Sequence, residues 1–345
     1  MAAAADNDGD FAIPRPPPVV ISVALLFAAL SVLLIGGYRY LAQHRGWVDA
    51  PNGRSSHTRI TPRGAGIIIV ALTALATVLV AAPSSLFWLS LMPGLGIAAI
   101  GWWDDLRSLP AAPRFAFYGL CTLLGVLAWP GSTALGPVLL LAGSLGLLWL
   151  VNLYNFMDGI NGLAALEAIF VLAASLLISP LSPYTEQFAG SILCIIGILG
   201  GFLVWNFPLA KVFMGDVGSA FLGFLLGLLA LWSSLLQGPP ISVWLILLGL
   251  FIVDTSYTLG VRIITGQQWH QAHRTHAYQK LNELSGNHAK TVAALMGVNI
   301  AWLLPLASAL QRGWLTAPTA LILAYLPLAV LCYALKAGIP RRTAV

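Results

Sequence analysis

The sequence contains little charge. Only 8% of its 345 residues are Asp, Glu, Lys or Arg, whereas 59% are hydrophobic; a soluble globular domain carries about 25% charged residues. This shortage excludes an ordinary soluble protein, and we expect a polytopic membrane protein whose solvent is the lipid bilayer. The net charge of +5 indicates no nucleic-acid partner, because the basic residues are scattered over loops, where membrane topology explains them better.

Cysteine is scarce, and the N-terminus lacks basic residues. The three cysteines lie in apolar runs at a spacing that suits neither a metal site nor an obvious disulfide, so we expect packing roles for Cys121, Cys194 and Cys332. The first residues are acidic where a signal peptide would be basic. We therefore expect residues 1–17 to be a disordered tail and the segment 19–38 to be retained as a membrane span.

Long apolar runs dominate what remains. A helix needs about 20 apolar residues to cross the hydrocarbon layer, and no segment shows the ten-residue alternation of a membrane barrel. The fold class is therefore all-α: one transmembrane domain over residues 18–336, with about eleven helices. The predicted spans are 18–40, 65–82, 86–103, 115–130, 134–151, 163–180, 187–205, 218–236, 241–262, 291–310 and 317–335.

Basic residues gather on one side of this topology. Fifteen of the 17 Lys and Arg residues lie at one set of helix ends, in the loops there, or in the C-terminal tail at 337–345. The positive-inside rule makes this side cytoplasmic. We therefore expect a bacterial inner-membrane protein with a periplasmic N-terminus and a cytoplasmic C-terminus. The loops on this side are 41–64, 104–114, 152–162, 206–217 and 263–290, and they hold every polar cluster of chemical interest.

Four carboxylates stand at cytoplasmic helix ends: Asp104, Asp105, Asp158 and Asp216. Such hard oxygen ligands suit Mg²⁺ or Mn²⁺, and Arg, Lys and His on the same face supply countercharge for phosphate oxygens. The stretches "DGINGL" and "GDVGS" place flexible backbone before a helix, where N–H groups bind anions. The combination predicts metal-assisted phosphate chemistry on a charged substrate beside a membrane.

Each cluster taken alone has a plainer interpretation. The Asp pair could cap a loop with Arg107 as partner, "NLYNFMDGING" could be a turn, Asp216 or Ser219 could cap the following helix, and the His cluster could be a solvated loop. Four such features would have no reason to share one face. Glu167 and Asp254 lie in or near spans, where an ionisable group suggests either a function or a supporting ion pair.

At these residues a family resemblance emerges. "NLYNFMDGINGLA" resembles the N-x-x-N-x-x-D-G-x-x-G-L-A signature of the polyprenyl-phosphate N-acetylhexosamine-1-phosphate transferases, "KVFMGDVGSAFLG" their F-x-G-D-x-G-S signature, and "DDLRSLPAAPRF" their D-D-x-x-x-L element. The family includes the phospho-MurNAc-pentapeptide translocase and the enzymes that start O-antigen and teichoic acid chains. Its eleven spans match in number.

Two stretches, "RSSHTRITPRGAG" and "HRTHAYQKL", look most like the O-antigen-initiating branch. Where the peptidoglycan translocase has three consecutive His, this chain has His-Arg-Thr-His, and Asn161 stands where the translocase has a second Asp. "RGAG" also stands where relatives often have "RGGG". These departures argue against the peptidoglycan substrate.

The resemblance implies a phosphoryl transfer. Undecaprenyl phosphate would attack the β-phosphorus of a UDP-sugar, releasing UMP and forming undecaprenyl-diphospho-sugar, with catalysis by positioning and electrostatic stabilisation. FucNAc, QuiNAc, GlcNAc and GalNAc all remain open as the sugar. The oligomeric state also remains open, with a homodimer as one option.

The resemblance also implies residue roles. Asp216 is the first choice for the Mg²⁺ (or Mn²⁺) ligand, with Asp104 as the second; Asp104 and Asp105 would complete the metal site or handle the lipid phosphate. A general base is hardly needed, because a phosphate monoester has its second pKa near 6. The expected catalytic set is Asp104, Asp105, Asp158, Asp216, His273 and His276. The expected substrate contacts are Asn152, Asn155, Asp158, Asn206, Lys211, Phe213, Arg63, His57, His273, Arg274 and His276, with Phe213 stacking on uracil.

Two other functions compete with this hypothesis. A transporter or flippase of a phosphorylated lipid or sugar would need polar residues on both faces and midway through spans, and it would release no UMP. A non-catalytic scaffold would tolerate Asp216→Asn. The concentration of polar chemistry on one face favours the enzyme.

Overall fold

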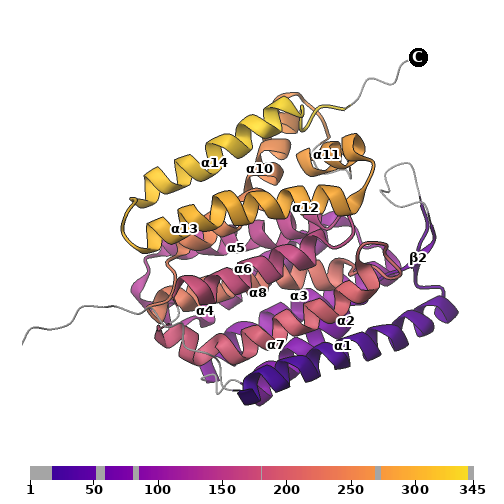
Figure 1. The fold of residues 1–345 in the computed structure, drawn as a ribbon, viewed down its shortest axis with the longest axis horizontal. Helices are drawn as coiled ribbons and strands as arrows, with labels where there is room; N and C mark the ends of the chain where they lie inside the picture. The colour runs from indigo at the N-terminus through magenta and orange to yellow at the C-terminus, as the bar shows by residue number, and fades with distance from the viewer. Residues whose placement is uncertain (1–17, 52–58, 81–84, 180, 269–272, 341–345) are drawn as a thin grey trace, which may run out of the picture.

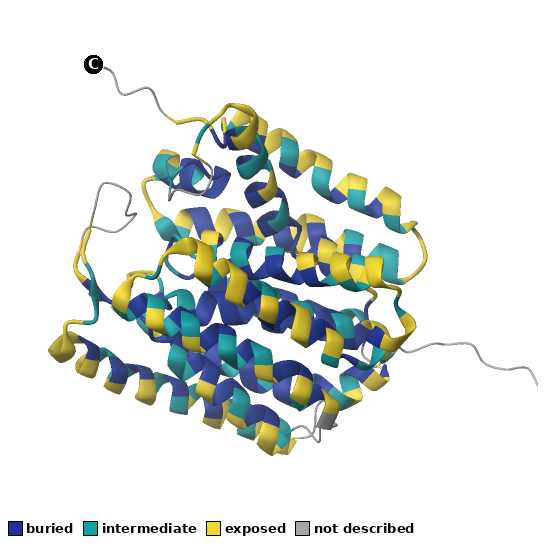
Figure 2. Cartoon of the chain, turned by 180° about the vertical axis from the view of Figure 1, so that it is seen from behind, coloured by how far each residue is buried: buried dark blue, intermediate teal, exposed yellow. Residues whose placement is uncertain are grey.

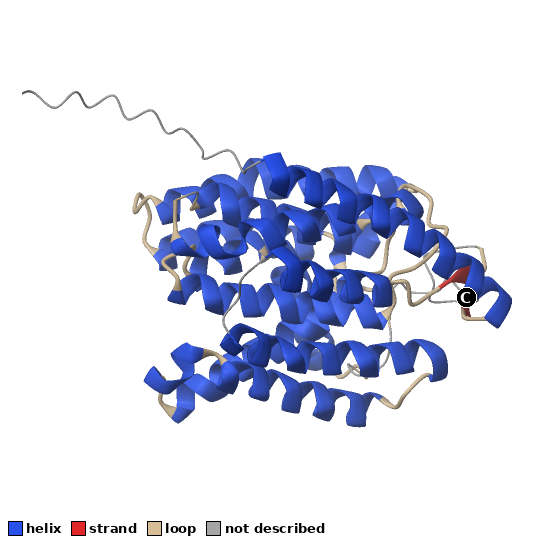
Figure 3. Ribbon diagram, turned by 90° about the horizontal axis from the view of Figure 1, so that it is seen from below, coloured by secondary structure: helices blue, strands red, loops and turns tan. Residues whose placement is uncertain are grey.

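Most described residues of this computed structural model lie in helices (Figure 1, Figure 3). The structure describes residues 18–51, 59–80, 85–179, 181–268 and 273–340. Within these ranges the only strands are a short antiparallel pair, β1 (Val48–Asp49) and β2 (Thr61–Pro62). The predicted all-α class is therefore confirmed.

The helices follow the predicted apolar runs along the chain. They are α1 (Pro18–Arg45), α2 (Gly66–Val80), α3 (Ser85–Arg107), α4 (Ala111–Ala128), η1 (Pro130–Ala134), α5 (Pro137–Met157), α6 (Leu163–Ile178), α7 (Pro183–Asn206), α8 (Asp216–Leu235), α9 (Ile241–Leu247), α10 (Gly249–Ile264), α11 (Ala277–Ser285), α12 (His288–Val298), η2 (Asn299–Leu303), α13 (Leu304–Gln311) and α14 (Ala317–Ala334).

Eight helices in the described ranges are long and apolar enough to cross a membrane, and the α9–α10 pair makes a ninth if it is one span. That pair bends by 74°, so the segment predicted as a span over 241–262 is not one straight helix. The bend falls where Gly249 follows Leu248, and glycine weakens a helix interior. The shorter apolar helices α2 and α6 occupy two further predicted positions, and the count of eleven spans stays a prediction.

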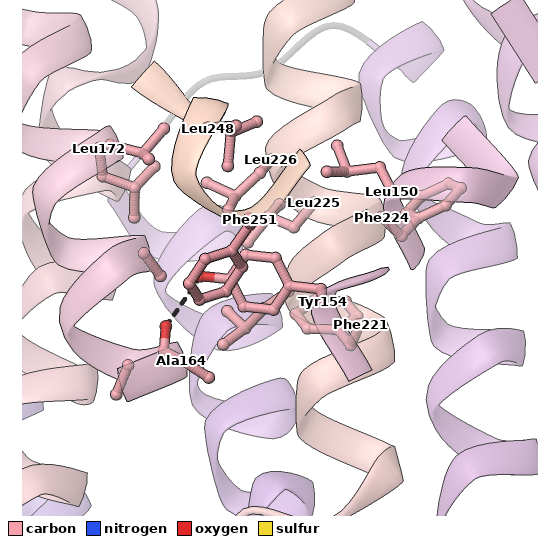
Figure 4. Close-up of a cluster of buried hydrophobic side chains, with 14 of the residues drawn as sticks. Leu150, Tyr154, Ala164, Leu172, Phe221, Phe224, Leu225, Leu226, Leu248 and Phe251 are labelled. Carbon is pink, nitrogen blue, oxygen red and sulfur yellow. Dashed lines mark hydrogen bonds between the residues drawn. The ribbon is translucent and has the colours of Figure 1, made fainter. Parts of the chain in front are cut away.

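Helix α8 forms the centre of the bundle. It is buried along most of its length between α2, α3, α4 and α5. Its side chains Phe221, Phe224 and Leu225 belong to the same buried cluster as Tyr154 of α5 and Phe251 of α10 (Figure 4). A helix that is apolar on all sides belongs in the interior of a bundle, and its N-terminus is therefore held firmly in place.

The outer helices carry many exposed residues (Figure 2), and many of these are large apolar side chains. An apolar surface this extensive would be a liability in water, whereas lipid solvates it. Together with the apolar helices, it supports a multi-pass membrane protein. Examples on α1, α5 and α14 are Leu25, Leu26, Leu33, Leu139, Leu141, Ile322, Leu326 and Val330. The three cysteines are buried and free, as predicted.

Helix α5 extends further than the sequence suggested. The predicted loop began at residue 152, but α5 continues to Met157, so Asn152 and Asn155 lie on its last turns. The side chain of Asn152 donates to the carbonyl of Leu148 at 2.7 Å, one turn earlier, which helps the polar segment to stay helical. The length of an apolar run indicates where the chain leaves the lipid, but the helix can continue beyond that point. The chain also forms α11, unpredicted, at the end of the bundle where β2 lies (Figure 1).

Candidate active site

Asp105, in the last turn of α3, caps the N-terminus of α8. It is 7% exposed; its Oδ1 accepts from the backbone N–H of Asp216 at 3.1 Å and its Oδ2 from that of Val217 at 3.2 Å. A carboxylate is favourable at this end of a helix. Gly215, with φ of 78°, permits the contact, because a Cβ there would lie 2.3 Å from Oδ2 of Asp105.

This geometry decides between the local alternatives for "GDVGS". Neither Asp216 nor Ser219 caps α8 with its own side chain. The hydroxyl of Ser219 donates to the carbonyl of Gly215 at 3.2 Å. The carboxylate of Asp216 is consequently left for other partners.

Arg114, near the start of α4, links two of the carboxylates. Its Nη1 donates to Oδ2 of Asp104 and, at 2.5 Å, to Oδ2 of Asp216. The remaining oxygen of Asp104 accepts from the backbone N–H of Leu109 at 2.5 Å. The cationic partner of Asp104 is therefore Arg114, and not Arg107. Sequence reasoning missed this role, although Arg114 stands within the quoted "DDLRSLPAAPRF".

Arg63 binds the backbone at the end of α3. Its Nε donates to the carbonyl of Asp105 at 2.6 Å and its Nη2 to that of Asp104 at 2.9 Å. A cation at this end of a helix satisfies carbonyls that have no partner within the helix. The carbonyl of Arg63 in turn accepts from the hydroxyl of Tyr38 at 2.7 Å, which ties α1 to the same place.

The "NLYNFMDGING" segment contributes two more polar side chains. Asn155 donates to the hydroxyl of Ser219 at 3.0 Å, which joins α5 to α8. Asp158, directly after α5, is half-buried, and within the described ranges its carboxylate makes no hydrogen bond or ion pair. Burial, with the nearby charges of Asp216 and Asp105, raises its pKa well above the usual range. A cation here would relieve that cost.

The four carboxylates are suited to a divalent cation. Asp104 and Asp216 share a single guanidinium group, and Asp158 has no partner among the described residues. No three His, Cys, Asp or Glu side chains in the described part of the chain stand ready as ligands. Mg²⁺, however, usually takes one or two carboxylates and completes its shell with water and phosphate. The residues present therefore fit Mg²⁺, while the ligand roles of Asp216 and Asp104 stay a prediction.

A second Asp caps a second helix. Asp254 of α10 accepts from the backbone N–H groups of Ala277 at 2.9 Å and Tyr278 at 2.8 Å, at the start of α11. It also contacts Nδ1 of His276 at 3.2 Å. Asp254 and His276 are both buried, at 5% and 3% exposed. His276 is thus held by an internal carboxylate.

His273 and Arg274 lie beside this second cap. The ring of His273 stacks on His276, with centroids 5.0 Å apart, and its Nδ1 lies 3.0 Å from the hydroxyl of Thr275. Burial, together with His276 and Arg262, lowers the pKa of His273 to about 3, so its imidazole is neutral at physiological pH. Arg274 approaches Glu283 at 3.9 Å, while its Nε is buried with no hydrogen-bond partner among the described residues.

The two caps are joined at the end of α5. The hydroxyl of Tyr278 donates to the carbonyl of Phe156 at 3.0 Å. Gly159 makes room for it, because a Cβ at that position would lie 2.0 Å from the Tyr278 oxygen. The structure thus brings the His cluster against the segment that carries Asp158.

Asn206 connects two of the predicted motifs. Its Oδ1 accepts from the backbone N–H of Gly162 at 2.6 Å, and its Nδ2 donates to the carbonyl of Val212 at 2.9 Å. At 6% exposed, the side chain is fully engaged in holding these loops together.

The other predicted substrate contacts do not all lie at the carboxylate cluster. The Lys211 ammonium lies over the ring of Trp205, 5.6 Å from its centroid. Phe213 is half-buried and pairs through its backbone with the segment around Pro62. His57 lies outside the described residues, as does His270.

Comparison with known proteins decides the family. The model of glycosyl transferase family 4 matches residues 87–234. A probable undecaprenyl-phosphate N-acetylglucosaminyl 1-phosphate transferase of Bacillus subtilis is 31% identical over 300 residues, which cover 80% of this chain and 81% of the relative. The chain belongs to glycosyl transferase family 4.

Two further relatives agree with this family assignment. A decaprenyl-phosphate N-acetylglucosaminephosphotransferase of Mycolicibacterium smegmatis is 28% identical over 324 residues, 78% of this chain and 77% of the relative. A phospho-N-acetylmuramoyl-pentapeptide-transferase of Treponema pallidum is 30% identical over 261 residues, 65% of this chain and 71% of the relative. The predicted membership of the polyprenyl-phosphate N-acetylhexosamine-1-phosphate transferases, with the pentapeptide translocase as a more distant member, is confirmed.

Proposed function

We propose that this protein transfers the 1-phosphate of an N-acetylated amino sugar from a UDP-sugar to undecaprenyl phosphate, with UMP as the leaving group. The carboxylate cluster at the N-terminus of α8 is the observation that carries the proposal. It gathers Asp104, Asp105, Asp158 and Asp216 around one helix end, with Arg63 and Arg114 as the adjacent cations. Three relatives support the reaction class: two are named as polyprenyl-phosphate N-acetylglucosamine-phosphate transferases and one as a phospho-N-acetylmuramoyl-pentapeptide-transferase.

The chemistry assigns different tasks to these groups. Asp216 and Asp104 would hold Mg²⁺, with Asp158 as a further candidate ligand, and the cation would offset the repulsion between two anionic phosphates. Arg114 keeps the oxygen atoms of Asp104 and Asp216 fixed in place and adds positive charge beside the phosphates. Asp105 holds α8 through its backbone, so it positions Asp216 without touching substrate.

The proposed setting follows from the charge asymmetry of the chain. The carboxylate cluster would face the cytoplasm of a bacterium at its inner membrane, with the N-terminus periplasmic and the C-terminus cytoplasmic. The stretches around "RSSHTRITPRGAG" and "HRTHAYQKL" favour the initiation of O-antigen or a related surface polysaccharide. The His273–Arg274 segment would then contact the sugar or diphosphate.

The decisive experiment uses purified full-length protein in lipid nanodiscs with undecaprenyl phosphate. UDP-GlcNAc, UDP-GalNAc, UDP-FucNAc and UDP-QuiNAc are supplied separately, and UMP and lipid-linked sugar are quantified. We expect equal amounts of both products with one preferred donor, and only when Mg²⁺ or Mn²⁺ is present. A folded protein that makes no UMP from any donor contradicts the proposal, and movement of intact ligand across the bilayer would favour a transporter.

A further inference from the structure

Glu167, one turn into α6, is fully buried, and its side chain has one hydrogen-bond partner among the described residues. Its exposed fraction is 0%, as is that of Asn299. Oε2 of Glu167 accepts from Nδ2 of Asn299 at 2.5 Å. The other oxygen of each group, Oε1 of Glu167 and Oδ1 of Asn299, is buried with no hydrogen-bond partner in the described ranges. No cation there forms an ion pair with Glu167.

An ionised carboxylate does not suit these surroundings. Burying a charge without a counterion inside an apolar bundle is costly, and an ionised Glu can only accept hydrogen bonds. It would leave two acceptors, Oε1 and Oδ1, without a donor. One proton is enough to satisfy both, because a carboxylic acid donates where a carboxylate cannot.

We propose that Glu167 retains its proton and donates it to Oδ1 of Asn299. Acid and carboxamide then form two parallel hydrogen bonds in one ring, and none of their polar atoms is left unpaired. Such a neutral pair costs far less to bury than an ion and joins α6 to the helix that carries Asn299. The pair lies outside the carboxylate cluster at α8.

Asn299 stands at a break in its helix. It begins η2, a widened π-turn between α12 and α13, in which the N–H of Leu304 donates to the carbonyl of Asn299. Pro305 follows and lacks the N–H that a regular helix would use, which accounts for the widening. Such turns often mark functional positions. Here the turn carries Asn299, whose side-chain amide donates to Glu167.

The pair positions the segment that precedes α6. At the other end of α12, Nδ1 of His288 accepts from the backbone N–H of Asn161 at 3.3 Å. Helix α12 therefore holds α6 through Glu167 and the adjoining "DGING" segment through His288. Glu167 is thus a positioning residue for Asp158, and this role rests on the proposed function, whereas the protonation of Glu167 does not.

The first test is Glu167→Gln in the full-length protein in nanodiscs. A carboxamide at position 167 can form both hydrogen bonds, so we expect the rate of UMP release to stay within about twofold at each pH, with an unchanged melting temperature. Infrared spectroscopy gives an independent signal. The carbonyl band of a protonated carboxylic acid should be present in the unmodified protein and lost in Glu167→Gln.

The second test is a double-mutant cycle with leucine. Glu167→Leu and Asn299→Leu each leave a buried polar group unpaired, so both should lower the melting temperature and the rate. Glu167→Leu/Asn299→Leu removes both partners and should recover much of the melting temperature, because replacing a whole polar pair is often nearly neutral. If the double variant instead loses as much melting temperature as the two single variants added together, the proposed pairing is contradicted.

The outcomes separate the inference from the proposed function. If no donor yields UMP, the infrared band and the melting cycle still decide whether Glu167 is protonated and paired. A missing band overturns the inference. So does a folded Glu167→Gln protein that has lost about 100-fold or more in rate, since that loss would indicate an ionised or proton-transferring Glu167.

Discussion

A buried Asp caps the N-terminus of a helix at two places in this protein, and the two caps differ in the charged groups around them. Asp105 caps α8 through the N–H groups of Asp216 and Val217. Asp254 caps α11 through those of Ala277 and Tyr278. In both, a buried carboxylate from a neighbouring helix satisfies two backbone donors that would otherwise lack partners.

The difference lies in the balance of charge. Asp254 has internal partners, with His276 and the hydroxyl of Thr258 completing its hydrogen bonds. Around Asp105, by contrast, further carboxylates collect: Asp104 and Asp216 share Arg114, and Asp158 makes no ion pair within the described ranges. A capping Asp is therefore a structural feature by itself. The surplus of negative charge is what distinguishes the α8 cap as a candidate reaction site.

Removing Asp216 should have the largest effect. In Asp216→Ala the cluster loses a proposed Mg²⁺ ligand and Arg114 loses a partner, so we expect the rate of UMP release to fall about 100- to 1,000-fold. The melting temperature should change little, because the side chain of Asp216 is not the cap of α8. UMP release at saturating Mg²⁺ measures the loss.

Asp254→Ala is the matched control at the other cap. It should lower the melting temperature strongly while the rate per folded molecule falls far less than in Asp216→Ala. The proposed distinction between the caps fails if both variants lose rate and stability to the same degree.

The second prediction concerns Arg114. Arg114→Gln removes the cation between Asp104 and Asp216, which leaves the phosphates with less countercharge, so we expect a loss of about 10- to 100-fold in rate. The same change makes the cluster more negative, so half-maximal activity should require less Mg²⁺. A Mg²⁺ titration of the rate measures both effects. Arg107→Gln is the control, and a rise in the Mg²⁺ requirement of Arg114→Gln would argue against the proposed electrostatics.

Part of this comparison could be predicted from the sequence. Apolar runs located most helices, because lipid imposes a length on each span. The charge asymmetry predicts that the polar clusters share one face of the membrane, and this stays a prediction. The motifs named Asp216 and Asp158. Those signals are local or compositional, and they do not depend on which helices are neighbours.

The rest depended on contacts between distant segments. Asp105 lies 111 positions from the N–H of Asp216, and no pattern within "GDVGS" reveals that cap. His276 seemed equally available for catalysis, but Asp254, 22 positions away, holds its ring in the interior. The bend between α9 and α10, which brings Asp254 to α11, is likewise invisible in an apolar run. The predicted catalytic roles stay predictions.

A milder substitution can compare the two caps directly. Asp105→Asn and Asp254→Asn each keep one acceptor and weaken a cap, and we expect each to cost about 1–2 kcal/mol in stability. Only Asp105→Asn should also lower the rate clearly, since it displaces Asp216. Melting temperature and UMP release, measured on the same preparations, give both quantities. Equal losses of rate would show that α11 also positions the reacting groups.

The smallest effect concerns His273. Its pKa is lowered from 6.5 to about 3 by burial, with His276 and Arg262 adding to the shift and Asp254 opposing it. Between about pH 6.5 and pH 3, His273 is therefore protonated in the unfolded chain but neutral in the folded protein. Its contribution to the free energy of unfolding is complete above about pH 6.5 and is lost as the pH falls toward 3. His273→Asn removes the penalty. Between about pH 7 and pH 5, the melting temperature of His273→Asn should fall less than that of the unmodified protein. The control is His44→Asn, at an exposed position, which should follow the unmodified protein. An identical fall in all three proteins would mean that His273 titrates normally and that the second cap is open to water.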